Sequence, residues 1–473
     1  MPSKPQRIRD PLHNIIDFDT DQFEETLWTV IQTFPFQRLR RIKQLGFSDF
    51  VYPGATHTRF AHCIGTFHTA RRLMQIIKRH LGRSEMQVQD HQIQVALAAS
   101  LVHDVGHGMF SHAFEEIGKK LNLKMARHEL VTEQLIGDGE IAQAFEPLGS
   151  GFAKDVATVI GQDGPRTLYD AVVSSQFDAD RLDYMQRDRL MAGVQNSGID
   201  FAWLIDNLEV GTIPQVVDDE KVGDIETFVL GPKAIYAAET FVLALFQLYP
   251  TVYLHKTTRA AEKVFSTLML HLIPLVQEGH ADKTGLPVNH PIIRFALNSD
   301  LLENAIALDD MVFMGALPMM VEADDPAVKE LAVRLYRRQL PKCIDIRSRI
   351  SASLGAGFFR RKDSDERLQK ATILIEERLQ EWIDNNSSSA PRILIDRAHR
   401  NPYREFQETK GPLNQIRIRT ASGKIFDLAE HSPVVAALEN FVLFRAYVDR
   451  LDTDATIMVE RTVNQVLEEK ADD

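Results

Sequence analysis

Cysteine is nearly absent from this sequence, since Cys63 and Cys343 are the only two in 473 residues. Two thiols cannot form a disulfide framework, and free thiols fit a reducing compartment. Long apolar stretches are also missing, because runs such as 241–246 and 268–276 are far shorter than the roughly 20 residues of a membrane helix. Residues 1–18 hold no apolar segment of a secretory signal. We therefore expect a cytoplasmic protein with no membrane partner.

An excess of basic residues is missing as well. Lys and Arg number 54 against 66 Asp and Glu, so the formal net charge is −12. Proteins that bind duplex nucleic acid usually carry a basic surface, which argues against that class. The chain has no G-x-x-x-x-G-K-[ST] motif, which excludes a P-loop ATPase. With 44% hydrophobic and 25% charged residues, the composition is that of a globular protein, and the length predicts at least two structural units.

The spacing of apolar residues predicts a mainly helical fold. The segments with helical spacing are 25–45 with a break at Pro35, 67–81, 92–105, 113–123, 128–137, 174–192, 234–279 divided at Pro250, 300–308 and 327–340. Strand signals are sparse, and they comprise a hairpin within 212–230 and short strands at 393–395, 415–419 and 424–426. A helix is expected from Val434.

Changes in composition along the chain predict the domain organisation. Residues 385–391, rich in Asn and Ser and ending in Pro391, have the composition of a linker. We expect three parts: a core over 1–280, a helical extension over 281–390, and a small α+β module over 391–473.

Histidine is what the sequence has in excess. Ten of its 16 histidines lie within residues 1–128. The densest cluster is the segment 101–112, LVHDVGHGMFSH, at the end of an almost wholly apolar helix. A carboxylate beside an imidazole is costly to bury unless a cation neutralises it, and a divalent metal does so. The alternative interpretation is a capped helix end with solvated histidines.

Two further segments offer metal ligands. His62 lies ahead of the helix expected from Phe67. Asp180, Tyr184 and Asp188 are spaced by four, so they form one stripe along a helix. Such a stripe suits a pocket wall with a metal at one end. The alternative is a solvated acidic face beside an Asp183–Arg187 pair.

The order His62, His103-Asp104, Asp180 resembles that of the HD-domain metal-dependent phosphohydrolases. The strings around these residues are similar to those of the dNTP triphosphohydrolase branch, the enzymes related to the sterile-alpha-motif/HD enzyme. They are Gln44-Leu45-Gly46, Tyr52 to Ala55, Arg59 to His62, His103 to His112, His128-Glu129 and Asp180 to Asp188. The resemblance covers about residues 36 to 260 and implies an HD-domain helical bundle core, without a sterile-alpha-motif domain.

The resemblance implies a divalent metal held by His62, His103, Asp104 and Asp180. Two imidazoles and two carboxylates suit Fe, Mn, Zn, Ni or Mg. In the implied reaction, a metal-activated water attacks the α-phosphate of a dNTP, and the products are a deoxynucleoside and inorganic triphosphate.

The resemblance also implies the other site residues. The catalytic positions are His128, which would protonate the leaving 5′ oxygen, Glu115, which would orient it, and His107. Relatives often carry Asp at the position of Glu115. The cations that would meet phosphate charge are Arg59, His107, His112, Arg181 and Lys256. The residues that would contact the deoxyribose are Gln44, Tyr184, Asp188 and Tyr253.

One segment departs from the family pattern. Residues 244–252 lack the Arg and His that close relatives carry upstream of the tyrosine. A nucleoside mono- or diphosphate, or a modified nucleotide, is therefore an alternative substrate. The alternative functions are another HD phosphohydrolase, such as a nucleotidase, phosphodiesterase or nuclease, and a non-catalytic nucleotide sensor or nucleic-acid-binding protein.

Partners follow from the same resemblance, which implies a homo-oligomer, a dimer or tetramer, in addition to the dNTP substrate. The basic clusters 38–43 and 360–362 are typical of solvated helix faces. Their alternative role is an anion site for a regulatory nucleotide or single-stranded nucleic acid.

Overall fold

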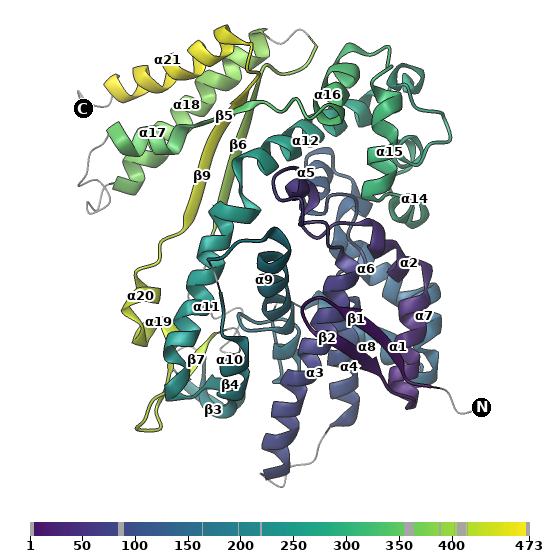
Figure 1. Cartoon of the computed structure of the whole chain (residues 1–473), viewed down its shortest axis with the longest axis vertical. Coiled ribbons are helices and arrows are strands. Elements are labelled where there is room, and N and C mark those ends of the chain that lie inside the picture. Colours follow the sequence, from purple (N-terminus) through teal and green to yellow (C-terminus); the bar gives the residue numbers. More distant parts are fainter. Residues whose placement is uncertain are drawn as a thin grey trace. The chain divides into compact units, whose positions relative to one another are not determined.

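The computed structural model describes residues 4–469 except 84–88, 163, 197, 218–219, 354–363, 387–388, 402, 404–412 and 414. The basic cluster 360–362 lies outside the described residues. The chain divides into two units (Figure 1). The first comprises Met1–Tyr253, Ser299–Met311 and Asn401–Glu439, and the second comprises Leu254–Asn298, Val312–Arg400 and Asn440–Asp473.

Most elements of the first unit are helices. Its helices are α1 (Gln22–Gln32), α2 (Phe34–Arg38), α3 (Arg59–Arg83), α4 (Asp90–Val102), α5 (His112–Leu121), α6 (His128–Gly137), α7 (Glu140–Phe145), α8 (Phe152–Gly161), α9 (Ala179–Ala192), α10 (Phe201–Asp206), α11 (Ile235–Leu248), α14 (Leu302–Ile306), α19 (Leu428–His431) and α20 (Pro433–Ala436). Its strands are β1 (Gln6–Asp10), β2 (Asn14–Phe18), β3 (Leu208–Val217), β4 (Glu220–Leu230), β7 (Arg417–Arg419) and β8 (Ile425–Asp427).

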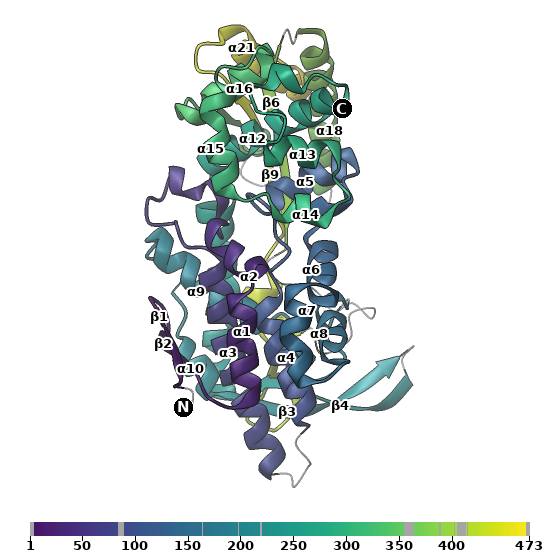
Figure 2. The ribbon, with the colours of Figure 1, turned by 90° about the vertical axis from the view of Figure 1, so that its right-hand side faces the viewer.

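In the first unit, helix α3 packs against both α4 and α9 (Figures 1 and 2). Helix α4 is buried on nearly all sides, from Val95 to Val102, as its apolar sequence predicts. The predicted metal ligands lie in the first turns of α3, directly after α4, and in the first turn of α9. Asp178 caps α9 by accepting a hydrogen bond from the Arg181 backbone N–H.

The first unit has two small sheets. Strands β1 and β2 form an antiparallel hairpin in which Ile8 pairs with Ile16. The other sheet has the order β3-β4-β7-β8, and β4 pairs with β7 in parallel.

The second unit combines helices with one antiparallel sheet. Its helices are α12 (Lys256–Gln277), α13 (Pro291–Leu297), α16 (Pro326–Tyr336), α17 (Ile346–Ser353), α18 (Ser364–Asn386) and α21 (Thr453–Glu469), and α15 (Asp310–Met320) begins at the unit boundary. The sheet has the order β5 (Lys342–Asp345), β9 (Phe441–Val448), β6 (Ile393–Arg400). Helices α17, α18 and α21 share an apolar core that includes Ile350, Ile375 and Val463.

The predicted fold class is confirmed, since the chain is mainly helical with small sheets. Pro35 lies in the first turn of α2, directly after the break at Thr33. Tyr249–Tyr253 form a π-helical turn around Pro250 and divide α11 from α12. The division into 1–280, 281–390 and 391–473 stays a prediction. The two compact units are made of segments from different parts of the chain, and they do not test these domain boundaries.

Several sequence predictions were wrong in detail. Helix α3 begins at Arg59, so His62 lies inside it rather than ahead of it. The predicted helix from Val434 is the short α20, and a strand, β9, and then α21 follow. Asn385 and Asn386, expected in a linker, end α18 instead. The hairpin β1–β2 was not predicted, because its charged and apolar residues do not alternate over a long run.

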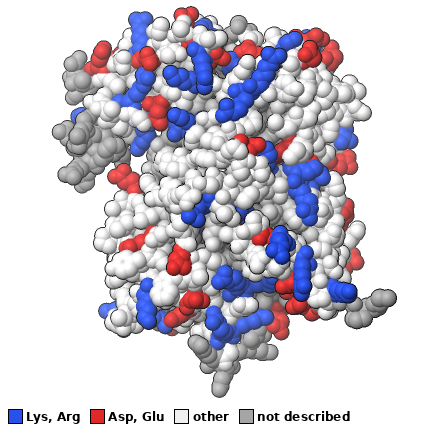
Figure 3. Space-filling model, in the orientation of Figure 1, with Lys and Arg blue, Asp and Glu red and all other residues white. Residues whose placement is uncertain are grey.

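One segment of the first unit is strongly apolar. Pro232–Tyr253 is long and apolar enough to cross a membrane by length and composition alone, which corrects the expectation that every apolar run is too short. Core helices pass the same test, and Phe241, Val242 and Leu248 of this segment are buried. On the face that Figure 3 draws, Lys and Arg side chains are interspersed with Asp and Glu.

Candidate metal centre and active site

Three side chains from three helices converge on one point of the first unit. His62 comes from α3, His103 follows the last residue of α4, and Asp180 lies in the first turn of α9. One donor atom from each lies within 4.8 Å of the others. The His62 Nε2 and Asp180 Oδ1 atoms are 2.9 Å apart, and the His103 Nε2 and Asp180 Oδ1 atoms are 3.7 Å apart.

The donor set fits a divalent cation. The Nδ1 atom of His103 lies 3.0 Å from the carbonyl oxygen of Ser100, so Nδ1–H donates and Nε2 keeps its lone pair. This buried Nε2 has no hydrogen-bond partner among the described residues. Imidazole nitrogens with a carboxylate are ligands for Fe, Mn, Ni and Zn, so the predicted need for a divalent metal is supported, and its identity is not determined.

Asp104 belongs to the same cluster but has other contacts. Its carboxylate binds Arg59 and lies 3.5 Å from His103 Nε2 and 3.9 Å from His62 Nε2. Although burial favours its neutral form, Arg59 and His103 hold the pKa of Asp104 well below its usual range. Asp104 is therefore a carboxylate, and its role as a fourth ligand stays a prediction.

His62 is charged in the absence of a metal. Burial lowers its pKa, but hydrogen bonds to Asp180 and Asp183 outweigh burial and raise the pKa to about 10. A metal ion that binds Nε2 must displace this proton, because ligating histidine is neutral.

A second cluster lies beside the first and contains the predicted catalytic residues. The Glu115 carboxylate lies 2.5 Å from His128 Nδ1, 3.5 Å from His107 Nδ1 and 3.3 Å from His112 Nδ1. The rings of His107 and His128 stack with centroids 4.0 Å apart. One donor atom from each of His107, Glu115 and His128 lies within 4.8 Å of the others, so this group could also hold a metal.

Charge in this second cluster is well defined. Burial favours the neutral acid of Glu115, but His112 and His128 hold its pKa far below the usual range. Burial, together with Arg59 and His128, lowers the pKa of His107, so His107 is neutral. The His107 Nε2 atom lies 3.2 Å from Asp104 Oδ1. The two clusters are thus joined through one buried contact.

Two of the predicted sugar contacts, Tyr184 and Asp188, lie on α9, and a third, Tyr253, contacts Asp188. The Tyr253 hydroxyl donates to Asp188 Oδ2 over 3.0 Å, and His57 Nε2 lies 2.8 Å from Asp188 Oδ1. The Tyr184 ring lies 6.2 Å from the Tyr253 ring and 6.4 Å from the His62 ring. Burial raises the pKa of both tyrosines, so their hydroxyls stay protonated.

The remaining predicted site residues have fewer close contacts with other side chains of the site. The Gln44 Oε1 atom is buried without a hydrogen-bond partner among the described residues. Arg181 lies 4.0 Å from Asp178, and the His112 side chain is 72% exposed. Lys256 is the first residue of α12 in the second unit, and its role as a phosphate contact stays a prediction.

One alternative interpretation and several residues need revision. The Asp183–Arg187 pair, expected on a solvated face, is fully buried. Three residues that were not predicted at the site, His57, His13 and Asp183, contact predicted site residues or each other. Their signal was the early excess of histidine, since His13 and His57 belong to it.

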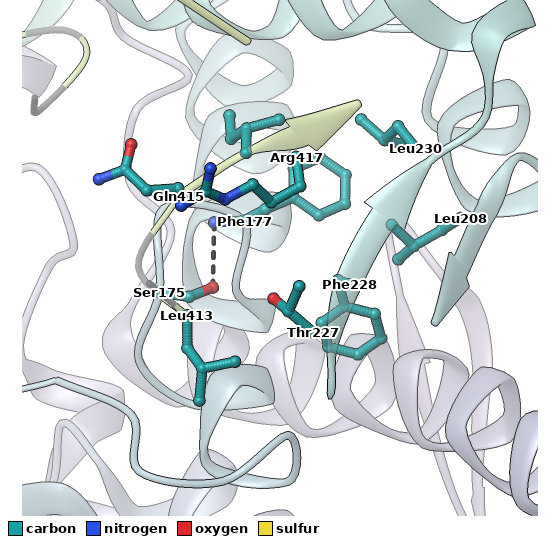
Figure 4. A pocket seen from close by; sticks show the side chains of 10 residues that line it. Ser175, Phe177, Leu208, Thr227, Phe228, Leu230, Leu413, Gln415 and Arg417 are labelled. Atoms are coloured by element: carbon teal, nitrogen blue, oxygen red, sulfur yellow. Dashed lines mark hydrogen bonds between the residues drawn. The ribbon is translucent and has the colours of Figure 1, made fainter. Parts of the chain in front are cut away.

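Two hollows elsewhere in the first unit do not fit a nucleotide site. The hollow in Figure 4, lined by Phe177, Thr227, Arg417 and others, has a volume of about 10 Å³, which holds one water at most. The second, of about 490 Å³, is lined by Arg72, Lys78, Arg79 and three other residues. Among these six, only Ile205 is buried, so no buried polar group would fix a ligand there.

Comparison with known proteins gives consistent matches. The HD domain family matches residues 59–185, and the HD associated region matches residues 217–284. The uncharacterized protein YwfO of Bacillus subtilis is 30% identical over 339 residues, which cover 72% of this chain and 71% of that protein. The deoxynucleoside triphosphate triphosphohydrolase SAMHD1 homolog of Dictyostelium discoideum is 30% identical over 239 residues, which cover 49% of this chain and 43% of that protein.

A solved structure extends the comparison to nearly the whole chain. The crystal structure of a phosphohydrolase from Bacteroides thetaiotaomicron is similar with a TM-score of 0.67 and 25% sequence identity. The match covers 94% of this chain and 100% of the other.

Proposed function

Because this chain belongs to the HD-domain family of phosphohydrolases, we propose that it hydrolyses deoxynucleoside triphosphates to a deoxynucleoside and inorganic triphosphate. The observation that carries the proposal is the single face of α9, where Asp180 of the metal cluster is followed by Tyr184 and Asp188. A phosphate subsite and a sugar subsite would then lie on one helix. The relatives named SAMHD1 support this substrate class, although this chain spans about half of their length or less.

His62, His103 and Asp180 would hold the metal, with Asp104 as a fourth ligand. A bound divalent cation would supply an electrophile for phosphate oxygens and would make water more acidic.

His128 would protonate the leaving 5′ oxygen. Its Nδ1 atom lies 2.5 Å from the Glu115 carboxylate, which would orient the ring and leave the Nε2 atom for proton transfer. The stacked His107 ring holds the plane of His128.

Arg59, His107, His112, Arg181 and Lys256 would meet phosphate charge. Arg59 already neutralises Asp104, so it would hold both the carboxylate and a phosphate oxygen within reach of the metal cluster.

Asp188 would accept a hydrogen bond from the sugar 3′-hydroxyl, with Gln44 beside it and Tyr184 against the ring. Both Asp188 oxygens are already held, by His57 and Tyr253, so the carboxylate is fixed before substrate binds. A site built this way would reject an analogue without the hydroxyl, because its polar groups would be left unpaired.

Another HD phosphohydrolase activity is the second candidate, and residues 244–252 favour it. This segment lacks the Arg and His that close relatives carry there. We also propose a cytoplasmic homo-oligomer, a dimer or tetramer, which binds a regulatory nucleotide; light scattering with and without dNTP tests the assembly.

Product analysis tests the proposed reaction. Purified protein is incubated with each dNTP and with Mn²⁺, Mg²⁺, Fe²⁺, Ni²⁺ or Zn²⁺, and the products are separated by ion exchange. We expect a deoxynucleoside and inorganic triphosphate in equal amounts. Release of orthophosphate or a nucleoside monophosphate would contradict the proposal and favour the second candidate.

His128→Ala is the matched variant for this assay. We expect turnover to fall by about 10²- to 10⁴-fold, because general acid catalysis contributes that much. Metal bound by His62, His103 and Asp180 should be retained, since His128 lies outside that triad, whereas a second metal bound by His107, Glu115 and His128 would be lost. Near-normal turnover would remove His128 from the mechanism.

A further inference from the structure

A buried carboxylate lies behind the metal ligand His62. The Asp183 side chain has 0% exposure, and its Oδ2 atom lies 2.9 Å from His62 Nδ1. On the other side, Asp183 Oδ1 lies 2.7 Å from His13 Nε2. Asp183 therefore bridges a ligand on α3 and a residue of the hairpin β1–β2.

The contact determines which nitrogen of His62 faces the metal cluster. Because the Asp183 carboxylate holds the proton on Nδ1, a metal ion would displace the proton on Nε2, and Nε2 would then present its lone pair to the cluster. A carboxylate on the far nitrogen of a ligating histidine fixes the ring and raises its basicity.

Arg187 holds Asp183 in this position. Its Nε atom donates to Asp183 Oδ2 over 2.8 Å, and its Nη2 atom donates to Asp183 Oδ1 over 3.0 Å. The Nη1 atom of Arg187 donates to Asp10 Oδ2 over 2.7 Å. Arg187 has no exposed side-chain surface, so both carboxylates balance a fully buried cation.

The Asp10 carboxylate that binds Arg187 also holds the turn of the hairpin β1–β2. Asp10 Oδ1 accepts hydrogen bonds from the backbone N–H groups of Leu12 and His13, each over 2.9 Å. Asp10 thereby fixes the turn that carries His13. This hairpin precedes residues 59–185, the part of the chain that matches the HD domain.

We propose that Asp183 is a positioning residue for the metal ligand His62, and that the hairpin β1–β2 belongs to the metal site through His13 and Asp10. The inference depends on the metal site and not on the identity of the nucleotide, so a different substrate would leave it intact.

Asp183→Asn is the direct test. The variant keeps the shape of the side chain but removes the charge and one acceptor. Binding of Mn²⁺ to metal-free protein is measured by titration calorimetry at constant pH. We expect the dissociation constant to rise about 10- to 100-fold, as for the loss of other such carboxylate partners.

A pair of His13 variants separates positioning from packing. His13→Gln keeps an N–H donor near the position of Nε2, whereas His13→Leu fills the space without a donor. We expect weaker Mn²⁺ binding for Leu and nearly wild-type binding for Gln. His91→Leu is the control, because His91 and its partner Asp155 are exposed and His91 lies at the opposite end of α4 from His103.

The proposal is overturned if folded Asp183→Asn and His13→Leu both bind Mn²⁺ within twofold of wild type while their unfolding temperatures fall. That result would give Asp183 a structural role alone. If Asp183→Asn does not fold, the comparison of His13→Leu with His13→Gln decides, and equal affinities would refute the proposal. If wild-type protein binds Mn²⁺ but does not hydrolyse dNTPs, the proposed function fails and the positioning role of Asp183 is not affected.

Discussion

The residues of the candidate metal cluster are held by buried partners. His62, His103 and Asp180 are brought together at a helix junction, and each imidazole has a second contact that fixes its orientation. His57 and His13, for which the sequence suggested no role, contact Asp188 and Asp183. The excess of histidine therefore serves partner positions as well as candidate ligands.

His68 provides a pH-dependent prediction. Burial, followed by His13 and Arg71, lowers its pKa from 6.5 to about 4. A histidine held neutral in the fold contributes its full stability above its unfolded pKa. That contribution is lost between pH 6.5 and 4, where the unfolded chain takes up a proton and the folded chain does not. Urea unfolding of wild type and His68→Gln across this range measures the effect.

We expect the free energy of unfolding to fall more steeply with acid in wild type than in His68→Gln. His80→Gln is a control, since His80 lies on the same helix but pairs with Glu226. Parallel pH profiles for wild type and His68→Gln would contradict the prediction.

At the scale of elements, the close approach of α3 and α9 positions the site. Gly65 of α3 faces α9, and a Cβ atom there would lie 2.1 Å from both Arg187 Nη2 and Asp183 Oδ1. A glycine within a helix usually costs stability, but here it makes room for the buried ion pair. The close packing of α3 against the Asp183–Arg187 pair, and not a special backbone conformation, thus explains why this position is glycine.

Gly65→Ala tests that explanation. We expect a destabilisation of about 1 to 3 kcal/mol, because the pair cannot move far in a packed interior. Gly82→Ala in the same helix is the matched control, because its Cβ would meet nothing within 4 Å. That variant should be neutral or more stable by up to about 1 kcal/mol. Equal thermal unfolding of the two variants would refute the steric argument.

At the scale of the whole molecule, the candidate metal centre lies within one of two units. Its ligands come from α3, from the end of α4 and from α9, which are distant in sequence. A metal ion that joins them binds only the folded state, so its binding energy adds to stability.

Metal removal should therefore lower the unfolding temperature. At a Mn²⁺ concentration 100 times its dissociation constant, the expected stabilisation is about 2.7 kcal/mol relative to metal-free protein. Differential scanning calorimetry with Mn²⁺ and with EDTA measures the shift. His103→Ala should show no shift, and an equal shift in that variant would place the metal elsewhere.

Prediction from sequence succeeded where the signal is local. The helical periodicity of α4, α6 and α9 indicated the fold class, because apolar spacing depends on neighbours one turn away. The start of α3 was wrong, because His62 and Gly65 interrupt the apolar pattern in its first turns. Strand β9 was missed, because its pairing with β6 and β5 joins segments far apart in the chain.

The sequence by itself determined the mainly helical fold class, the family resemblance and the residue types of the candidate metal cluster, since these depend on short motifs and spacing. Only the tertiary structure decided which buried groups hold those residues. Asp183 contacts His13 across 170 positions and His62 across 121 positions. No local pattern encodes such contacts, because they arise when α3, α9 and the hairpin pack together and bury charges that must then be paired.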